Sequence, residues 1–141
     1  MTLCKCRIER RTKRLLAKSG LEDVINDYTF DRYIVSDKWQ QHIKQTALKY
    51  AANPVNWFFI GGQVGAGKSH ICTAIVGELL KRGMPCLYML WRDEAVRLKA
   101  VVTDEFEYQT GINRLKQIDC LYIDDFFRTE KGKQPTSADI N

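Results

Sequence analysis

The fold of this chain is decided by the stretch Gly62-Gln63-Val64-Gly65-Ala66-Gly67-Lys68-Ser69. The stretch matches the phosphate-binding pattern G-x-x-x-x-G-K-[ST] at every position, and proteins that use this pattern place it between a buried strand and a helix. Before it stands the apolar run 55–60, broken only by Asn56, and after it apolar residues recur at helical spacing. The sequence therefore predicts a strand, a phosphate-binding loop and a helix in succession.

The residue types of this stretch suit a nucleotide with Mg²⁺. Its glycines let the backbone fold with N–H groups pointing inward, and the helix that begins near Lys68 turns the positive end of its dipole toward the loop. Lys68 adds a positive charge for the β- and γ-phosphates, and the hydroxyl of Ser69 is a hard oxygen ligand for Mg²⁺. His70 can line the phosphate pocket through its backbone N–H, and we expect no catalytic role for its imidazole. The alternative is a glycine-rich structural turn, which the flanking strand and helix disfavour.

A second chemical feature is the pair Asp124-Asp125, which ends the apolar stretch 118–123. Ligands of open parallel sheets bind at the carboxyl ends of the strands. We expect Asp124 to hold Mg²⁺, directly or through water, and Asp125 to orient or deprotonate an attacking water. This is the Walker B arrangement, which makes Asp125 and Lys68 the predicted catalytic residues. Carboxylates at strand ends also serve solvation alone, so the prediction depends on the phosphate-binding loop.

The remaining segments predict an α/β domain. The expected elements are a basic helix over 3–18 ended by Gly20, a helix capped by Ser36 or Asp37 and ended at Asn53-Pro54, a helix from Lys68 to Gly83, a strand over 86–90, a charged helical segment over 91–117 with a break at Gly111, and a strand over 118–123. Strands that alternate with helices favour a parallel sheet with flanking helices, because a parallel pair requires a long crossover.

Length, charge and hydropathy limit the class of protein. The 141 residues, 45% of them hydrophobic, suit one globular domain over 21–141 with a basic helical extension over 1–20. No apolar run approaches the roughly 20 residues of a membrane span, so we expect a cytoplasmic protein without a membrane partner. The chain has a net charge of +5, and residues 1–20 alone have a net charge of +6, with seven basic residues against one acidic residue. These residues can face nucleic acid or an acidic partner, but a solvated helix face is the favoured interpretation.

The cysteines indicate a reducing compartment. The chain has 5 cysteines, an odd count, and Cys72, Cys86 and Cys120 lie in apolar stretches where a thiol packs as a small hydrophobe. Cys4-x-Cys6 is either half of a zinc site or a pair of residual cysteines, since two thiols do not complete a tetrahedral site.

These residues resemble AAA+ ATPases of the helicase-loader type (DnaC/DnaI-like), in particular phage-encoded versions. The resemblance rests on the P-loop and the Asp124-Asp125 strand and extends to segments 19–21, 28–30, 124–127 and 131–136. It implies a partial AAA+ core with the P-loop NTPase fold, ATP or ADP with Mg²⁺ as ligands, and an adenine site to which Phe30 contributes. It also implies slow hydrolysis, a homo-oligomer for the full-length protein, and delivery of a replicative DNA helicase onto single-stranded DNA.

The end of the chain departs from the family's pattern. A complete AAA+ core continues past its acidic strand into a sensor strand, an arginine finger and usually a lid, whereas this chain stops at Asn141 just after a helix start near Thr136. We expect a fragment or a truncated gene product that binds nucleotide and hydrolyses it slowly, because an arginine finger contributes about 10³ to 10⁵ in rate.

Other functions remain open from the sequence. A transposition helper ATPase uses the same loop and also acts on DNA, and a small-molecule kinase can be built on the same strand, loop and helix. A nucleotide-gated interaction module, in which turnover hardly matters, is the non-enzymatic reading. The aromatic and basic residues between 91 and 116 suit either contacts to single-stranded DNA or amphipathic packing.

Overall fold

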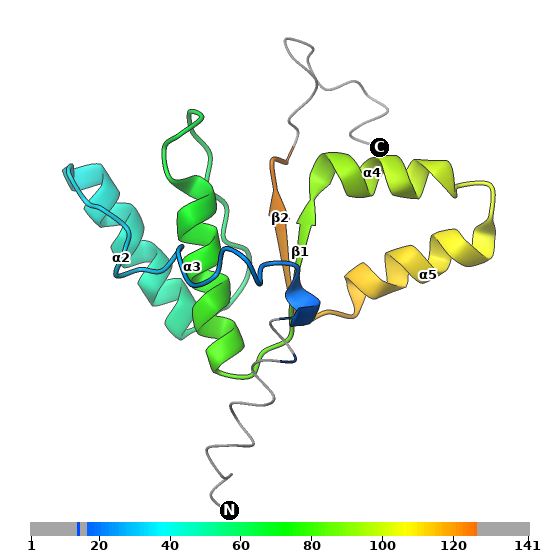
Figure 1. Cartoon of the computed structure of the whole chain (residues 1–141), viewed down its shortest axis with the longest axis horizontal. Coiled ribbons are helices and arrows are strands. Elements are labelled where there is room, and N and C mark those ends of the chain that lie inside the picture. Colours follow the sequence, from blue (N-terminus) through cyan, green and yellow to red (C-terminus); the bar gives the residue numbers. More distant parts are fainter. Residues whose placement is uncertain (1–13, 15–16, 127–141) are drawn as a thin grey trace, which may run out of the picture. The chain divides into compact units, whose positions relative to one another are not determined.

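The computed structural model of the protein describes Arg14 and residues 17–126. The chain divides into two compact units, residues 1–86 and residues 87–141, and each has its own arrangement of elements. Figure 1 traces these elements along the chain, from α2 and α3 in the first unit to α4, α5 and β2 in the second. The predicted basic helix over 3–18 and the pair Cys4-x-Cys6 lie largely or wholly outside the described residues. Gly20 does adopt the left-handed conformation expected after a helix, with φ of 81°.

Helix α2 (Lys38–Ala52) begins at one of the two predicted caps. Asp37 is the N-cap residue, and the side-chain Oε1 of Gln40 accepts hydrogen bonds from the backbone amides of Asp37 at 2.9 Å and Ser36 at 2.6 Å. This is the returning half of a capping box, which satisfies amides at a helix start. The helix ends at Asn53 as predicted, because the following proline disfavours a helical conformation in the residue before it.

Helix α3 (Lys68–Lys81) forms the centre of the first unit. Its buried residues are Ile71, Thr73, Ala74, Ile75, Val76, Leu79 and Leu80. The helix packs against α2, where Ala47 and Ala51 are buried, and the buried side chains of the lead-in segment complete the core: Leu21, Ile25, Phe30 and Tyr33. At its end, the guanidinium of Arg82 donates to the carbonyl of Ala51, which ties the two helices together. The predicted helix and its apolar face are confirmed.

The second unit contains a small parallel sheet and a pair of helices. Strand β1 (Cys86–Leu90) and strand β2 (Cys120–Asp124) pair directly and point the same way (Figure 1). Between them in sequence lie helix α4 (Trp91–Ala100) and helix α5 (Glu105–Lys116), which pack on each other. The predicted strands over 86–90 and 118–123 are thus confirmed, the second with a shift of its start to Cys120.

The predicted break at Gly111 is wrong. The chain turns at 101–104, where the side chain of Asp104 accepts a hydrogen bond from the amide of Glu107 at 3.0 Å and caps α5. Gly111 lies inside α5, and a Cβ atom added there would stand 3.1 Å from Cδ2 of Leu98 in α4. The glycine therefore marks a close approach of two helices, which a single sequence does not distinguish from a helix end.

The expected buried strand over 55–60 is also not formed. These residues carry no regular structure, and Trp57 and Phe59 are 97% and 82% exposed. Asn56 has a left-handed backbone with φ of 69°, which interrupts an extended run, and its carbonyl accepts a hydrogen bond from the hydroxyl of Tyr50 at 3.0 Å. A strand buried on both faces needs neighbouring strands to satisfy its backbone, and residues 17–85 contain none.

Candidate functional site

The loop before α3 has the backbone that a phosphate-binding turn requires. Gly62, Gly65 and Gly67 have φ of 150°, 81° and 81°, a region that residues with a Cβ atom rarely adopt. Around Gly62 and Gly65 an added Cβ would meet nothing within 4 Å, so these two glycines serve the backbone conformation alone. At Gly67 an added Cβ would stand 2.9 Å from Cε2 of Tyr33, so this residue also permits a close approach.

Lys68 folds its side chain back over this loop. Its ammonium donates hydrogen bonds to the carbonyl of Gly62 at 2.9 Å and to the carbonyl of Gln63 at 2.6 Å. The amide of Ala66 donates to the carbonyl of Gln63 at 3.3 Å, which closes the turn. A positive charge is therefore held directly over the loop by groups that a phosphate oxygen can replace.

The start of α3 adds a second source of positive potential. Gly67 is the N-cap, the helix is 14 residues long, and its first turn contains no acidic side chain. The first N–H groups of an α-helix have no carbonyl partner within the helix, and the helix dipole favours an anion there. Ser69 lies half-buried in this first turn, while Gln63 and Val64 are exposed and Ala66 is half-buried. The donors of residues 62–69 thus fit the phosphates of a nucleotide.

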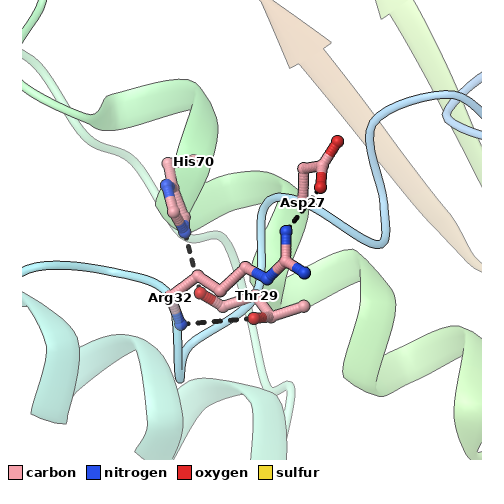
Figure 2. Close-up of polar contacts among 4 residues, drawn as sticks. All are labelled: Asp27, Thr29, Arg32 and His70. Carbon is pink, nitrogen blue, oxygen red and sulfur yellow. Dashed lines mark hydrogen bonds and ion pairs between the residues drawn. The ribbon is translucent and has the colours of Figure 1, made fainter.

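His70 makes contacts that the sequence did not reveal (Figure 2). Its ring nitrogen Nε2 lies 2.7 Å from the carbonyl oxygen of Thr29, the contact drawn in Figure 2. Its ring also stacks on Tyr28 with centroids 5.0 Å apart. The prediction for His70 considered only its backbone N–H, because the partner lies 41 residues away in sequence. Phe30 is 7% exposed and belongs to the core of the unit, so a contact between its side chain and adenine stays a prediction.

The acidic pair lies at the carboxyl end of β2, as predicted. Asp124 is half-buried in the strand, and Asp125 is exposed with a left-handed backbone of φ 51°. The amide of Asp125 donates to Oδ1 of Asp124 at 3.0 Å. On the neighbouring strand, burial raises the pKa of Tyr88, and the carboxylates of Asp124 and Asp125 raise it further. Tyr88 therefore stays protonated beside the two negative charges.

The expected metal site draws on both compact units. Ser69 belongs to the first unit, and Asp124 and Asp125 belong to the second. Within the residues that the structure describes, no group of three or more histidine, cysteine or acidic side chains could hold a metal ion. A joint role of Ser69 and Asp124 stays a prediction.

The aromatic and basic residues of α4 and α5 are only partly available for DNA. Phe106 is 81% exposed, whereas the ring of Trp91 packs edge-on against Phe126 with centroids 4.8 Å apart. Arg97 is paired with Glu94, and Arg92 lies 3.6 Å from Asp93.

Within the described part of the chain, no helix is both long and apolar enough to cross a membrane.

Residues 24–139 match the model of the bacterial DnaA ATPase domain. The chain belongs to this family. Membership implies an AAA+ P-loop fold, which agrees with the α/β composition, the parallel strand pair and the glycine-rich loop ahead of α3.

Individual relatives come from phage-related and replication proteins. The chain is 32% identical to the phage-like element PBSX protein XkdC of Bacillus subtilis, an alignment that covers 98% of the chain and 54% of that protein. It is 24% identical to the replicative helicase loader DnaC of Buchnera aphidicola (strain Sg), over 82% of the chain and 49% of the loader. It is 31% identical to the chromosomal replication initiator protein DnaA of Aquifex aeolicus, over 94% of the chain and 34% of the initiator.

These similarities confirm the predicted resemblance to AAA+ helicase loaders and their phage-related versions. They do not favour the transposition helper or the kinase. The chain spans about half the length of the first relatives it matches. No solved structure matches the chain.

Proposed function

We propose that the protein binds Mg-ATP through residues 62–69 and couples this binding to delivery of a replicative DNA helicase onto single-stranded DNA. Nucleotide binding is supported by the structure at the N-terminus of α3. Glycines with positive φ shape the loop, the ammonium of Lys68 lies over it, and no acid opposes the helix dipole. Helicase delivery is supported by the similarity to proteins named as replicative helicase loaders.

The proposed binding step exchanges one set of partners for another. The ammonium of Lys68 leaves the carbonyls of Gly62 and Gln63 and binds the β- and γ-phosphates, which accept stronger, charge-assisted hydrogen bonds. The amides of the loop and of the first turn of α3 donate to the remaining phosphate oxygens.

Hydrolysis, in this proposal, depends on the acidic pair. Ser69 and Asp124 are the residues that would hold Mg²⁺, an ion that would neutralise charge on the phosphates, and Asp125 would orient the attacking water. Asp125 is exposed at the end of β2, so it can meet a water molecule without first leaving a buried position. An arginine supplied by another region or another copy is the usual accelerator in such sites.

A loading assay tests the proposal. Labelled single-stranded DNA is mixed with a replicative helicase, and DNA-bound helicase is measured with ATP, with ADP and without nucleotide. We expect this protein to increase bound helicase when ATP is present, and Lys68→Ala to remove the increase.

The matched control for that assay is Lys81→Ala. Lys81 stands in the last turn of the same helix and pairs with Glu78 at 2.7 Å, far along α3 from the loop. It should behave as the parent. Helicase loading that is the same with and without ATP, or that survives Lys68→Ala, would show that this function is wrong.

A further inference from the structure

The side chain of His70 contacts Thr29, which lies 41 residues earlier in the sequence. The carbonyl oxygen of Thr29 can only accept a hydrogen bond, so Nε2 of His70, 2.7 Å away, must carry the proton. The same carbonyl accepts a second hydrogen bond from the amide of Tyr33 at 3.1 Å. Both lone pairs of the Thr29 carbonyl are therefore used, one by α3 and one by the segment itself.

Two tyrosine rings of this segment also contact the imidazole. Tyr28 stacks on it with an interplanar angle of 17°, and Tyr33 meets it edge-on with centroids 5.3 Å apart and an angle of 76°. Each aromatic pair of this kind contributes about 0.5–1.5 kcal/mol beyond the burial of its area. Residues 28–33 are thus fixed to α3 at three points around one side chain.

The remaining polar contacts of the segment are weaker anchors. Arg32 and Asp27 form an ion pair at 2.5 Å, but both side chains are more than 60% exposed. An exposed pair contributes about 0–1 kcal/mol. The amide of Arg32 donates to the hydroxyl of Thr29 at 3.3 Å, which shapes the segment internally (Figure 2). Of the segment's polar contacts, the hydrogen bond to His70 is therefore the one that ties it to α3, alongside the buried side chains of Phe30 and Tyr33.

The same segment reaches the phosphate-binding loop. The ring of Tyr33 stands so close to Gly67 that a Cβ there would clash with it, and His70 directly follows Ser69. Tyr28 keeps 39% of its surface exposed although one face lies on His70. An aromatic side chain with exposed surface beside a phosphate site suits the flat ring of a base.

We propose that His70 is a positioning residue: its ring holds residues 28–33, the segment in which the family resemblance already implies an adenine contact, beside the glycine-rich loop. The inference rests on the proposed binding of nucleotide by residues 62–69 and adds the side chain that positions the segment expected to contact the base. Loss of the His70 ring lowers the affinity for ATP and leaves the affinity for the phosphate chain alone.

The test compares two ligands on the full chain. Isothermal titration calorimetry with Mg²⁺ measures the Kd for ATP and for inorganic tripolyphosphate, and the ratio of the two isolates the base and sugar. We expect His70→Ala to lower this preference for ATP about tenfold, since a hydrogen bond and an aromatic contact together contribute on the order of 1.4 kcal/mol. Tripolyphosphate binding should change less than twofold.

Conservative variants separate the hydrogen bond from general damage. His70→Gln keeps a side-chain N–H that can donate to Thr29 and should restore most of the preference. His70→Phe keeps the ring contacts without the donor and should fall between the parent and His70→Ala. Tyr28→Ala, which leaves α3 untouched, should reduce the preference several-fold. His42→Ala is the control, because His42 is the other histidine of the chain and lies exposed on α2.

The outcomes have separate meanings. If the parent binds both ligands and His70→Ala weakens both equally, or neither, the positioning role is wrong while nucleotide binding stands. If His70→Gln is no better than His70→Ala, the hydrogen bond to Thr29 is not the cause and the role is likewise overturned. A parent that binds neither ligand overturns the proposed function, and the inference with it.

Discussion

Gly67 meets two requirements at the junction between the loop and α3. Its φ of 81° is the same as that of Gly65, but only at Gly67 would a Cβ approach Tyr33. The ring of Tyr33 is 6% exposed and has little room to move. A side chain added at either glycine would therefore be strained by the same backbone angle, but only a side chain at Gly67 would also clash with Tyr33.

We expect Gly65→Ala to lower the free energy of unfolding by about 1–2 kcal/mol, the usual penalty for a side chain in the left-handed region. Gly67→Ala should lose a further 1–3 kcal/mol, roughly the range for overpacking a filled site. Urea unfolding of both variants measures the difference. Equal losses would mean that the contact between Tyr33 and Gly67 is not tight.

Tyr88 gives a prediction for alkaline pH. Burial, with Asp124 and Asp125, raises its pKa above the ordinary value of 10.0, so the unfolded chain loses this proton at a lower pH than the folded chain. The folded state is then favoured below pH 10, and this contribution is lost as the pH rises through the raised pKa. The free energy of unfolding of the parent should fall more steeply above pH 10 than that of Tyr88→Phe. Identical slopes would contradict the shift.

Among the helices and strands, the sequence predicted those whose signals are local. Asn53-Pro54 ends α2, and the apolar spacing after Lys68 gives the buried face of α3. The choice between Ser36 and Asp37 as the cap could not be made, because either can start a helix; the interaction of Gln40 with both amides appears only in three dimensions.

The two wrong predictions concern elements whose state depends on distant partners. An apolar run such as 55–60 predicts a buried strand only if other strands enclose it, and no periodicity reports whether they do. Gly111 was interpreted as a helix end, yet it allows α5 to approach Leu98 of α4. The true start of α5, at Asp104, carries a cap signal of the ordinary kind.

Asp104 therefore carries a prediction for α5. Asp104→Ala should lower the free energy of unfolding by about 1 kcal/mol, because the amide of Glu107 loses its side-chain acceptor. Thr103→Ala, one position earlier and exposed, is the control and should change it by less than about 0.5 kcal/mol. Chemical denaturation checks both. If the two substitutions lowered the free energy of unfolding equally, Asp104 would not be a stabilising cap of α5.

For the molecule as a whole, the glycine-rich loop before α3 and the acidic end of β2 were both located from sequence. The loop has the expected backbone, and Asp124 and Asp125 do end a strand. The side chain of His70 was missed because nothing within a few residues of it indicates a partner at Thr29. Local sequence patterns thus identified the loop and the acidic pair, whereas the contact between His70 and Thr29 could be seen only in the folded structure.

Asp124 and Asp125 have proposed roles in magnesium binding and in water orientation, and each role yields a prediction. Asp124→Asn should weaken ATP binding in the presence of Mg²⁺ and leave binding in EDTA unchanged, since only the metal contact is altered. Asp125→Asn should keep ATP affinity and lower hydrolysis at least tenfold, roughly the lower range for loss of a group that orients the attacking water. Calorimetry and phosphate release measure the two effects. A loss of affinity in EDTA for Asp124→Asn would contradict the assignment.

The central claim is that residues 62–69 bind the phosphates of ATP, and the most direct measurement is a calorimetric titration of the parent, Lys68→Ala and Lys81→Ala with Mg-ATP. The account predicts binding by the parent and by Lys81→Ala, and a loss of at least about tenfold in affinity for Lys68→Ala, because its charge-assisted hydrogen bonds contribute roughly 1.5–3 kcal/mol. Equal affinity of Lys68→Ala and the parent would contradict it.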